Sequence, residues 1–282
     1  MVNRRQFLYT TAGTALLAGS PRLFAAAKAP RRKPPFRVLY GNDTTNTVSC
    51  VSPWHKKGEP FRASQLEASV DEVTGTGVEV HLLQPGLGWI PWWQSKVYPP
   101  QEHYRWFKER TGCDPDSFGK YVLAGGDLVK LFIERCRKHG QTPFISLRMN
   151  DAHHLEYVDE KSRNAVWASK LYVEHPEYRI GQDPKRTEQR VLNWAIPAVR
   201  AQKLAFIQEL CENYDLDGFE MDFMRFYSLF QLDKTTSEQR RGIMTEFTRH
   251  VRSVIDRTAR AHKAIVVCHC ALCGRAPRAP GV

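Results

Sequence analysis

Short apolar runs alternate with longer helical patterns along most of this chain, and this alternation restricts the possible folds most strongly. The predicted strands are residues 36–41, 78–83, 144–150, 217–224 and 264–268. The predicted helices are residues 61–74, 127–140, 197–214 and 237–261. Strict alternation of strands with helices is typical of parallel strands joined by right-handed crossovers. The sequence therefore predicts an α/β fold with a parallel sheet.

Two α/β architectures satisfy this alternation, a doubly wound open sheet and a (β/α)8 TIM barrel. No glycine-rich turn joins the first strand to its helix, as a nucleotide-binding doubly wound fold would require. The connections that follow the strands are long and rich in aromatic and charged residues, and barrels place their active sites there. We therefore expect the (β/α)8 barrel type.

The length of 282 residues sets a limit on how much of a barrel is present. Four β-α units occupy residues 36–262, so eight units of that size would need well over about 400 residues. We therefore expect only the first four to five units, with residues 36–267 as the N-terminal part of a barrel and 268–282 as an atypical tail. The alternative is an open half barrel that forms a homodimer through its exposed sheet edge.

The net charge of +11 lies at the two ends of the chain. Residues 1–34 hold seven basic side chains and residues 268–282 hold two, with no acidic residue in either segment, so residues 35–267 contain 32 basic and 30 acidic residues. A nearly neutral body lacks the basic groove that nucleic-acid binding requires. Nucleic acid is therefore not an expected partner.

The N-terminus resembles a twin-arginine export signal of bacteria. Arg4 and Arg5 precede an apolar stretch that runs to Leu17, and small residues end at Ala27. This resemblance implies an export signal at 1–27, a proline-rich linker at 28–35, the export machinery as a partner, and a periplasmic or secreted location. The apolar stretch is shorter than the roughly 20 residues of a membrane span, so we expect no stable span, although an uncleaved anchor is the alternative.

The segment 217–224 carries the most specific motif. Its period of two sends Phe219, Met221 and Phe223 toward the helices, and Gly218, Glu220 and Asp222 toward the barrel interior. Two carboxylates on the inner face of a strand are costly to bury unless they are paired or used.

This segment resembles the fourth strand of glycoside-hydrolase-like (β/α)8 barrels, in which D-G-apolar-x-apolar-D is followed by an aromatic residue and often by arginine, here Arg225. The resemblance implies that Glu220 or Asp222 is catalytic, as acid/base or as nucleophile. The chitinase-like variant of the motif would have its glutamate where this chain has Met224. Glycoside hydrolysis also needs a second carboxyl about 5 to 10 Å away, and similar barrels supply it from a later strand.

The strand at 144–150 directs further polar side chains to the same end of the sheet. Arg148 shares the inward parity, and an Arg148–Glu220 ion pair is the structural alternative to catalysis. Arg148 could also hold a carboxylate ionised by lowering its pKa. The residues that we expect to contact substrate here are Arg148, Asn150, Asp151, His153 and His154, with Asn42 and Asp43 at the end of the first strand and Arg225 after the fourth.

Trp89, Trp92 and Trp93 lie in the loop after the second strand, where their faces could stack on sugar rings. Burial of the three rings under the loop is an equally weighted alternative. Cys136 and Cys211 lie on apolar helix faces and are expected to be buried thiols. The Cys268–Cys273 cluster lacks a second ligand group, so no metal and no cofactor are expected.

Together these features predict an exported glycoside-hydrolase-like protein that hydrolyses or binds a carbohydrate. A non-catalytic carbohydrate-binding or structural half barrel is the alternative, because the second catalytic carboxylate is missing from the expected place. A metal-dependent hydrolase that uses His153 and His154 is the weaker alternative.

Overall fold

The computed structural model describes residues 36–48, 53–56, 58–87, 89–262 and 266–267. The predicted signal, linker and tail, and the cysteines at 50, 268, 270 and 273, lie outside the described residues. Residues from Phe36 onward belong to one compact unit. Within the described part of the chain no helix is long and apolar enough to cross a membrane.

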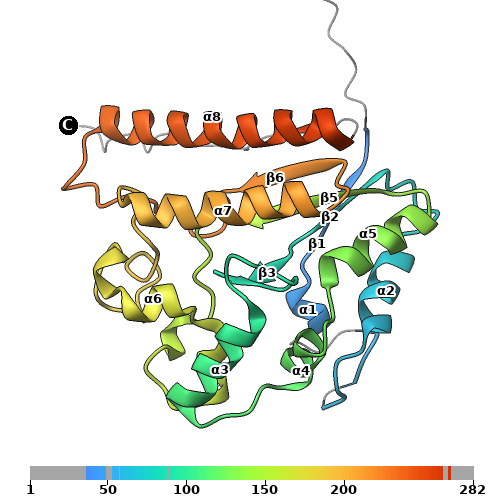
Figure 1. The fold of residues 1–282 in the computed structure, drawn as a ribbon, viewed down its shortest axis with the longest axis horizontal. Coiled ribbons are helices and arrows are strands. Elements are labelled where there is room, and N and C mark those ends of the chain that lie inside the picture. Colours follow the sequence, from blue (N-terminus) through green and yellow to red (C-terminus); the bar gives the residue numbers. More distant parts are fainter. Residues whose placement is uncertain (1–35, 49–52, 57, 88, 263–265, 268–282) are drawn as a thin grey trace, which may run out of the picture. The chain divides into compact units, whose positions relative to one another are not determined.

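Five parallel strands form the main sheet, and their order in space follows their order in the chain (Figure 1). The strands are β1 (Leu39–Asn42), β2 (Val80–Leu83), β5 (Thr142–Arg148), β6 (Gly218–Asp222) and β7 (Val266–Val267). Successive crossovers in one direction give this order, whereas a doubly wound sheet reverses direction at a switch point. The α/β prediction is confirmed. The described strands make an open sheet, and they do not close into a barrel.

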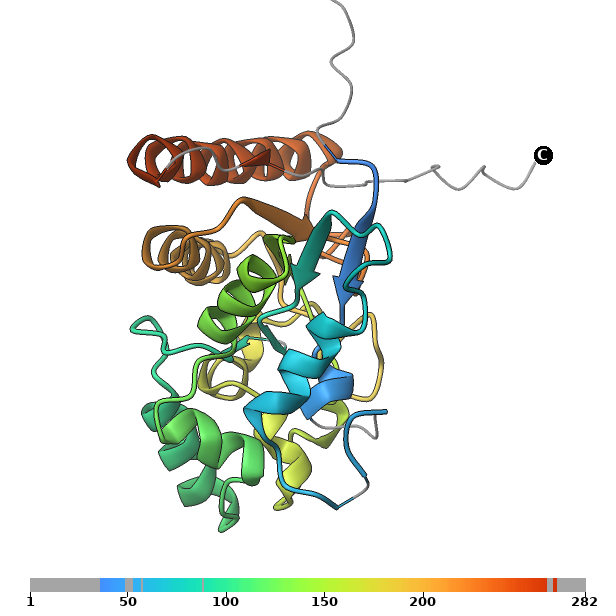
Figure 2. The same ribbon diagram turned by 90° about the vertical axis from the view of Figure 1, so that its right-hand side faces the viewer.

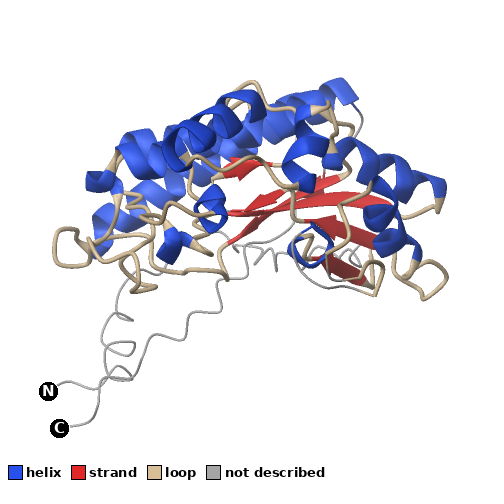
Figure 3. Ribbon diagram, turned by 90° about the horizontal axis from the view of Figure 1, so that it is seen from below, coloured by secondary structure: helices blue, strands red, loops and turns tan. Residues whose placement is uncertain are grey.

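Long helices follow the strands as the alternation predicts. They are α2 (Ala63–Asp71) after β1, α5 (Leu128–Lys138) after β2, α7 (Pro197–Asn213) after β5 and α8 (Ser237–His262) after β6. The side chain of Asp127 caps α5 by accepting a hydrogen bond from the backbone N–H of Lys130 at 2.9 Å. In Figure 3 these helices lie on one side of the sheet, and in Figure 2 β1 lies at the sheet edge beside β2.

The main core lies between the sheet and the helices. Phe219, Met221 and Phe223 belong to it, which confirms the parity predicted for this strand. Cys136 and Cys211 are fully buried, and burial raises the pKa of both thiols to about 12. The opposite face of the sheet holds a smaller apolar cluster of Val80, Leu82 and Phe144, with Phe36 packed against it.

Gly218 is needed on this opposite face because a Cβ at that position would overlap the ring of Phe144. The Phe144 ring therefore packs against β6 at Gly218, two residues before Glu220. This face of the sheet, which we call the inner face, changes from apolar to polar toward the carboxyl ends of the strands.

The connections at the carboxyl ends of the strands contain the remaining short elements. These are α1 (Thr45–Val48), β3 (Gly86–Leu87), β4 (Ile90–Pro91), α3 (Pro100–Thr111), α4 (Ser117–Leu123), α6 (Lys170–Glu174) and the 3-10 turns η1 (Leu155–Tyr157), η2 (Arg163–Trp167) and η3 (Pro176–Tyr178). β3 and β4 form a small antiparallel pair. These connections build the region in which parallel α/β proteins bind ligands.

Candidate active site

The register between β5 and β6 decides which polar side chains meet. Ser146 lies opposite Glu220, and Arg148 lies opposite Asp222. The alternative of an Arg148–Glu220 ion pair is therefore wrong, because the arginine is one inner-face position nearer the strand end than Glu220. Glu220 is partly buried, and its carboxylate forms no hydrogen bond or ion pair with another residue of the described part of the chain.

Arg148 is the centre of the site. Its side chain is only 7% exposed and contacts three carboxylates: Nη2 lies 2.8 Å from Asp43, Nη1 lies 3.2 Å from Asp151, and Nε lies 3.9 Å from Asp222. Asp222 also accepts a hydrogen bond from the backbone N–H of Met224 at 2.8 Å. A single guanidinium group thus links the ends of β1, β5 and β6, as its fork of donors permits.

The positive charge of Arg148 helps to keep two of these carboxyls ionised. Burial by itself raises the pKa of Asp43, but the charge of Arg148 and hydrogen bonds from Thr45 and Arg148 outweigh it, so the net pKa is lowered. Burial also opposes ionisation of Asp151, whose pKa is nevertheless lowered by His153 and Arg148. The predicted effect of Arg148 on a neighbouring carboxylate is therefore seen at Asp43 and Asp151.

His153 and His154 follow this cluster but have different surroundings. His153 Nδ1 lies 2.5 Å from Asp151, which also accepts the backbone N–H of His153 at 3.0 Å. His154 has a left-handed backbone, with φ of 61°, and burial lowers the pKa of its imidazole. Among the described residues no group of three or more His, Cys, Asp or Glu side chains is placed to hold a metal ion.

Two predicted substrate contacts, Asn150 and Asn42, are held by hydrogen bonds within the protein, and Asn42 also lines the cavity at the strand ends. Asn150 is buried and donates to the carbonyl oxygens of Leu192 and Ser228, both at 2.9 Å, so it fastens two loops to the end of β5. Asn42 is buried and donates to Ser69 of α2 at 2.9 Å. Its side chain points to the helix layer, because its parity on β1 is opposite to that of an inward-facing position.

The prediction that three tryptophans form an exposed stacking surface is wrong, and the buried alternative holds. Trp89, Trp92 and Trp93 are 3%, 2% and 1% exposed. Trp93 donates its indole N–H to Glu209 of α7 at 2.8 Å. The loop folds back across α7, so rings that looked exposed in a long loop fill the core.

A cavity of about 190 Å³ lies on the inner face at the strand ends. Its lining includes Asp43, Arg148, Asp222 and the exposed Arg225, together with Ser146, Gln84 and Leu82. Because Asp43 and Asp222 contact the same guanidinium, their contacting carboxyl oxygens are no more than about 9 Å apart, so they do not exceed the largest separation of two glycosidase carboxyls. Asp43, directly after β1, thus brings a further carboxylate to the cavity that Asp222 lines.

The sequence interpretation missed two buried charges on α7. Lys203 is 1% exposed; its Nζ lies 3.8 Å from the centre of the Trp89 ring and donates to the carbonyl of Arg148 at 3.2 Å. Burial lowers the pKa of Lys203 to about 7, against the opposing charge of Asp151. Glu209 accepts hydrogen bonds from Trp93 and Ser95. The available signal was helical spacing, since Lys203 shares a face with apolar Val199, Phe206 and Leu210.

Comparison with known proteins gives structural neighbours that are glycoside hydrolases. An alpha-galactosidase from Lactobacillus brevis is 18% identical, with 82% of this chain and 26% of that chain covered and a TM-score of 0.41. A beta-N-acetylhexosaminidase from Bacteroides fragilis is 12% identical, with 82% and 41% covered and a TM-score of 0.44. A maltogenic alpha-amylase from Thermotoga neapolitana is 13% identical, with 82% and 44% covered and a TM-score of 0.42.

The chain spans less than half the length of each of these three enzymes. No protein-family model and no curated protein sequence matches it. TM-scores below 0.5 and identities below 20% assign the chain to none of these enzymes' families.

Proposed function

We propose that this protein binds a carbohydrate at the carboxyl ends of its parallel strands and hydrolyses a glycosidic bond there. The observation that carries this proposal is the cavity in which Asp43 and Asp222 converge on Arg148. Carboxylates about 5 to 10 Å apart are the common requirement of glycoside hydrolysis. The motif of β6 supports the same assignment.

Glu220 and Asp222 are the carboxyls that we assign to the reaction. Glu220 lies beside the lining of the cavity, two positions before Asp222 on the same face of β6, and we assign to it the proton exchange with the leaving group. Asp222 lies at the cavity with Asp43, where negative charge stabilises an oxocarbenium-like transition state. Arg148 positions both aspartates, and Arg225 lies where it can contact sugar hydroxyls.

One observation favours binding without hydrolysis as a second candidate. Arg148 already contacts three carboxylates, and the lowered pKa values of Asp43 and Asp151 keep these two ionised, so neither is a proton donor near neutral pH. In this second candidate function the same cavity binds a glycan, but Glu220 has no second carboxyl with which to complete the proton transfers of hydrolysis.

Release of reducing sugar from a panel of polysaccharides separates these candidates. Glu220→Gln and Asp222→Asn should each lower turnover by about 10²- to 10⁴-fold while glycan binding persists. Glu246→Gln is the matched control, because Glu246 is exposed on α8, away from the cavity. Turnover that is unchanged in both site variants would refute the catalytic assignment, and binding without turnover in the wild type would support the second candidate.

Export is proposed from the N-terminal signal at 1–27, with a periplasmic or secreted location. Replacing both Arg4 and Arg5 by lysine should leave the protein in the cytoplasmic fraction of a bacterial host. Appearance of the double variant in the periplasm at wild-type levels would contradict twin-arginine export.

Assembly of two copies through the β1 edge, where Leu39 is 45% exposed, is a further proposal that sedimentation can test.

A further inference from the structure

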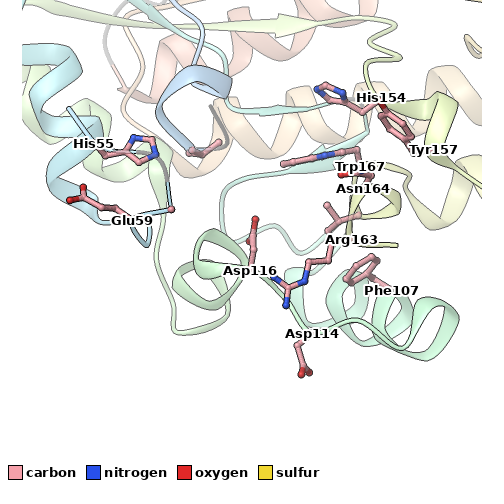
Figure 4. A pocket seen from close by; sticks show the side chains of 13 residues that line it. His55, Glu59, Phe107, Asp114, Asp116, His154, Tyr157, Arg163, Asn164 and Trp167 are labelled. Carbon is pink, nitrogen blue, oxygen red and sulfur yellow. The ribbon is translucent and has the colours of Figure 1, made fainter. Parts of the chain in front are cut away.

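A second, larger cavity lies in the loops beyond the strand ends (Figure 4). Its volume is about 470 Å³, in the range of about 300 to 1,000 Å³ that small-molecule sites occupy. Three separate parts of the chain line it: the segment after β1 with His55 and Glu59, the α3–α4 region with Asp114 and Asp116, and the turns η1 and η2. None of these residues belongs to the cavity around Arg148.

The two cavities are connected by a chain of direct contacts. Asp151 contacts Arg148 in the first site and His153 at 2.5 Å. The ring of His153 lies 6.1 Å from that of His154, which lines the second cavity and lies 5.9 Å from the ring of Trp167. The two cavities are therefore joined through side chains of one connection, the one that follows β5.

One wall of this cavity is aromatic and the others are polar. Phe107, Tyr157 and Trp167 provide the aromatic wall, and Tyr157 and Trp167 are each partly exposed. Arg163 and Asn164 are exposed at the same cavity and carry planar groups that can hydrogen-bond two adjacent hydroxyls. An aromatic face beside planar polar groups suits a sugar ring, which has an apolar C–H face and a rim of hydroxyls.

The charges at the cavity identify the kind of sugar. Two of its carboxylates are already paired: Asp114 lies 2.7 Å from Lys108 Nζ, and Glu59 lies 3.5 Å from Arg62 Nη2. Asp116 accepts the backbone N–H of Gly119 at the start of α4, Arg163 adds a cation to the lining, and burial lowers the pKa of the His154 imidazole. Among the described residues the charges at this cavity therefore roughly cancel, so it lacks the excess of cations that would attract uronates, sulfates or phosphates. Neutral hydroxyls, by contrast, can donate hydrogen bonds to these carboxylates.

We infer that this cavity binds a sugar unit of a neutral glycan. The inference rests on the proposed carbohydrate function and adds to it a location and a charge class for the glycan.

The test uses the full chain on an array of neutral gluco-, galacto-, manno- and xylo-oligosaccharides beside uronic-acid and sulfated oligosaccharides. We expect binding to the neutral members, and then calorimetry with the strongest binder should show a Kd raised about tenfold or more by Trp167→Ala and by Arg163→Ala. Arg241→Ala, at an exposed arginine of α8, is the control and should leave the Kd unchanged. Arg163→Ala removes an exposed side chain, so it remains informative if Trp167→Ala does not fold.

Equal or tighter binding of the acidic oligosaccharides would overturn the inference. Absence of binding to every oligosaccharide on the array would also overturn it. A Kd that is unchanged in both cavity variants, together with loss of turnover in Asp222→Asn, would overturn the inference while leaving the proposed function in place. If the wild-type protein shows no hydrolytic turnover but binds a neutral oligosaccharide in a way that depends on Arg163, then the inference stands and the proposed hydrolysis is refuted.

Discussion

The buried lysine of α7 gives the sharpest stability prediction. Lys203 is 1% exposed and its pKa falls from 10.5 to about 7 because burial disfavours the charged form. At about 1.4 kcal/mol for each pKa unit, keeping this amine in the folded protein at pH 7 costs about 4 kcal/mol relative to an unburied lysine. Replacing it by methionine, which has a similar length and no charge, removes that cost.

Two favourable contacts are lost in the same substitution. The hydrogen bond to the Arg148 carbonyl contributes about 1 kcal/mol, and the ammonium against the Trp89 ring contributes about 1 to 2 kcal/mol. Lys203→Met should therefore raise the free energy of unfolding by about 1 to 2 kcal/mol at pH 7.

The sign of the effect should depend on pH. The folded-state pKa of Lys203 is lower than the unfolded one, so its cost is largest below about pH 7 and disappears as the pH rises toward 10.5. Near pH 10 the charge penalty is about 1 kcal/mol or less, and loss of the amine's hydrogen bond makes Lys203→Met neutral or slightly destabilising.

Urea unfolding followed by tryptophan fluorescence at pH 7 and pH 10 measures both differences. Lys130→Met is the control, because Lys130 is exposed on α5 and its substitution should change stability little at either pH. If Lys203→Met is destabilised at pH 7 by more than about 1 kcal/mol and by the same amount at pH 10, then Lys203 is charged and well compensated in the core, and the reasoning is wrong.

Three further predictions concern the fold around the site. Arg148→Met should lower the free energy of unfolding by about 3 to 5 kcal/mol at pH 7, because it removes the guanidinium shared by Asp43 and the fully buried Asp151 and leaves His153 as the partner of Asp151; this loss should shrink as the pH falls below the ordinary carboxyl value of 3.8, and a constant loss in a pH series of urea melts would argue against it. Asp127→Ala removes the cap of α5 and the acceptor of the Tyr214 hydroxyl at 2.6 Å, so urea unfolding should show a loss of about 1 to 2 kcal/mol, and no loss would mean that water replaces the cap. Gly218→Ala should cost about 1 to 3 kcal/mol by the same measurement, because the new methyl group overlaps the Phe144 ring, and full stability would show that the ring can move aside.

Local patterns were sufficient for the elements and their faces. The period of two in 217–224 predicted the burial of Phe219, Met221 and Phe223, and helical spacing predicted α5, α7 and α8 to within a few residues. The buried thiols of Cys136 and Cys211 were predicted for the same reason. These properties depend on neighbours within one or two turns or strand residues, and the sequence lists those neighbours directly.

The composition of the site depended on contacts between distant segments. Parity placed Arg148 on the inner face, but only the β5–β6 register put it opposite Asp222 rather than Glu220. Asn150 was correctly placed at the strand end, yet its partners Leu192 and Ser228 lie in loops whose paths have no periodic signal.

The sequence by itself determined that strands and helices alternate, that the strands run parallel, and which side of β6 carries carboxylates. Only the tertiary structure decided that Asp43, over 100 residues before Arg148, shares its guanidinium, that the tryptophans of 89–93 are buried, and that loops from three units enclose a second cavity. The physical reason is the separation along the chain of the residues that interact. Periodicity reports the preferences of adjacent residues, whereas register, loop packing and cavities arise from the simultaneous fit of segments that are distant in the chain.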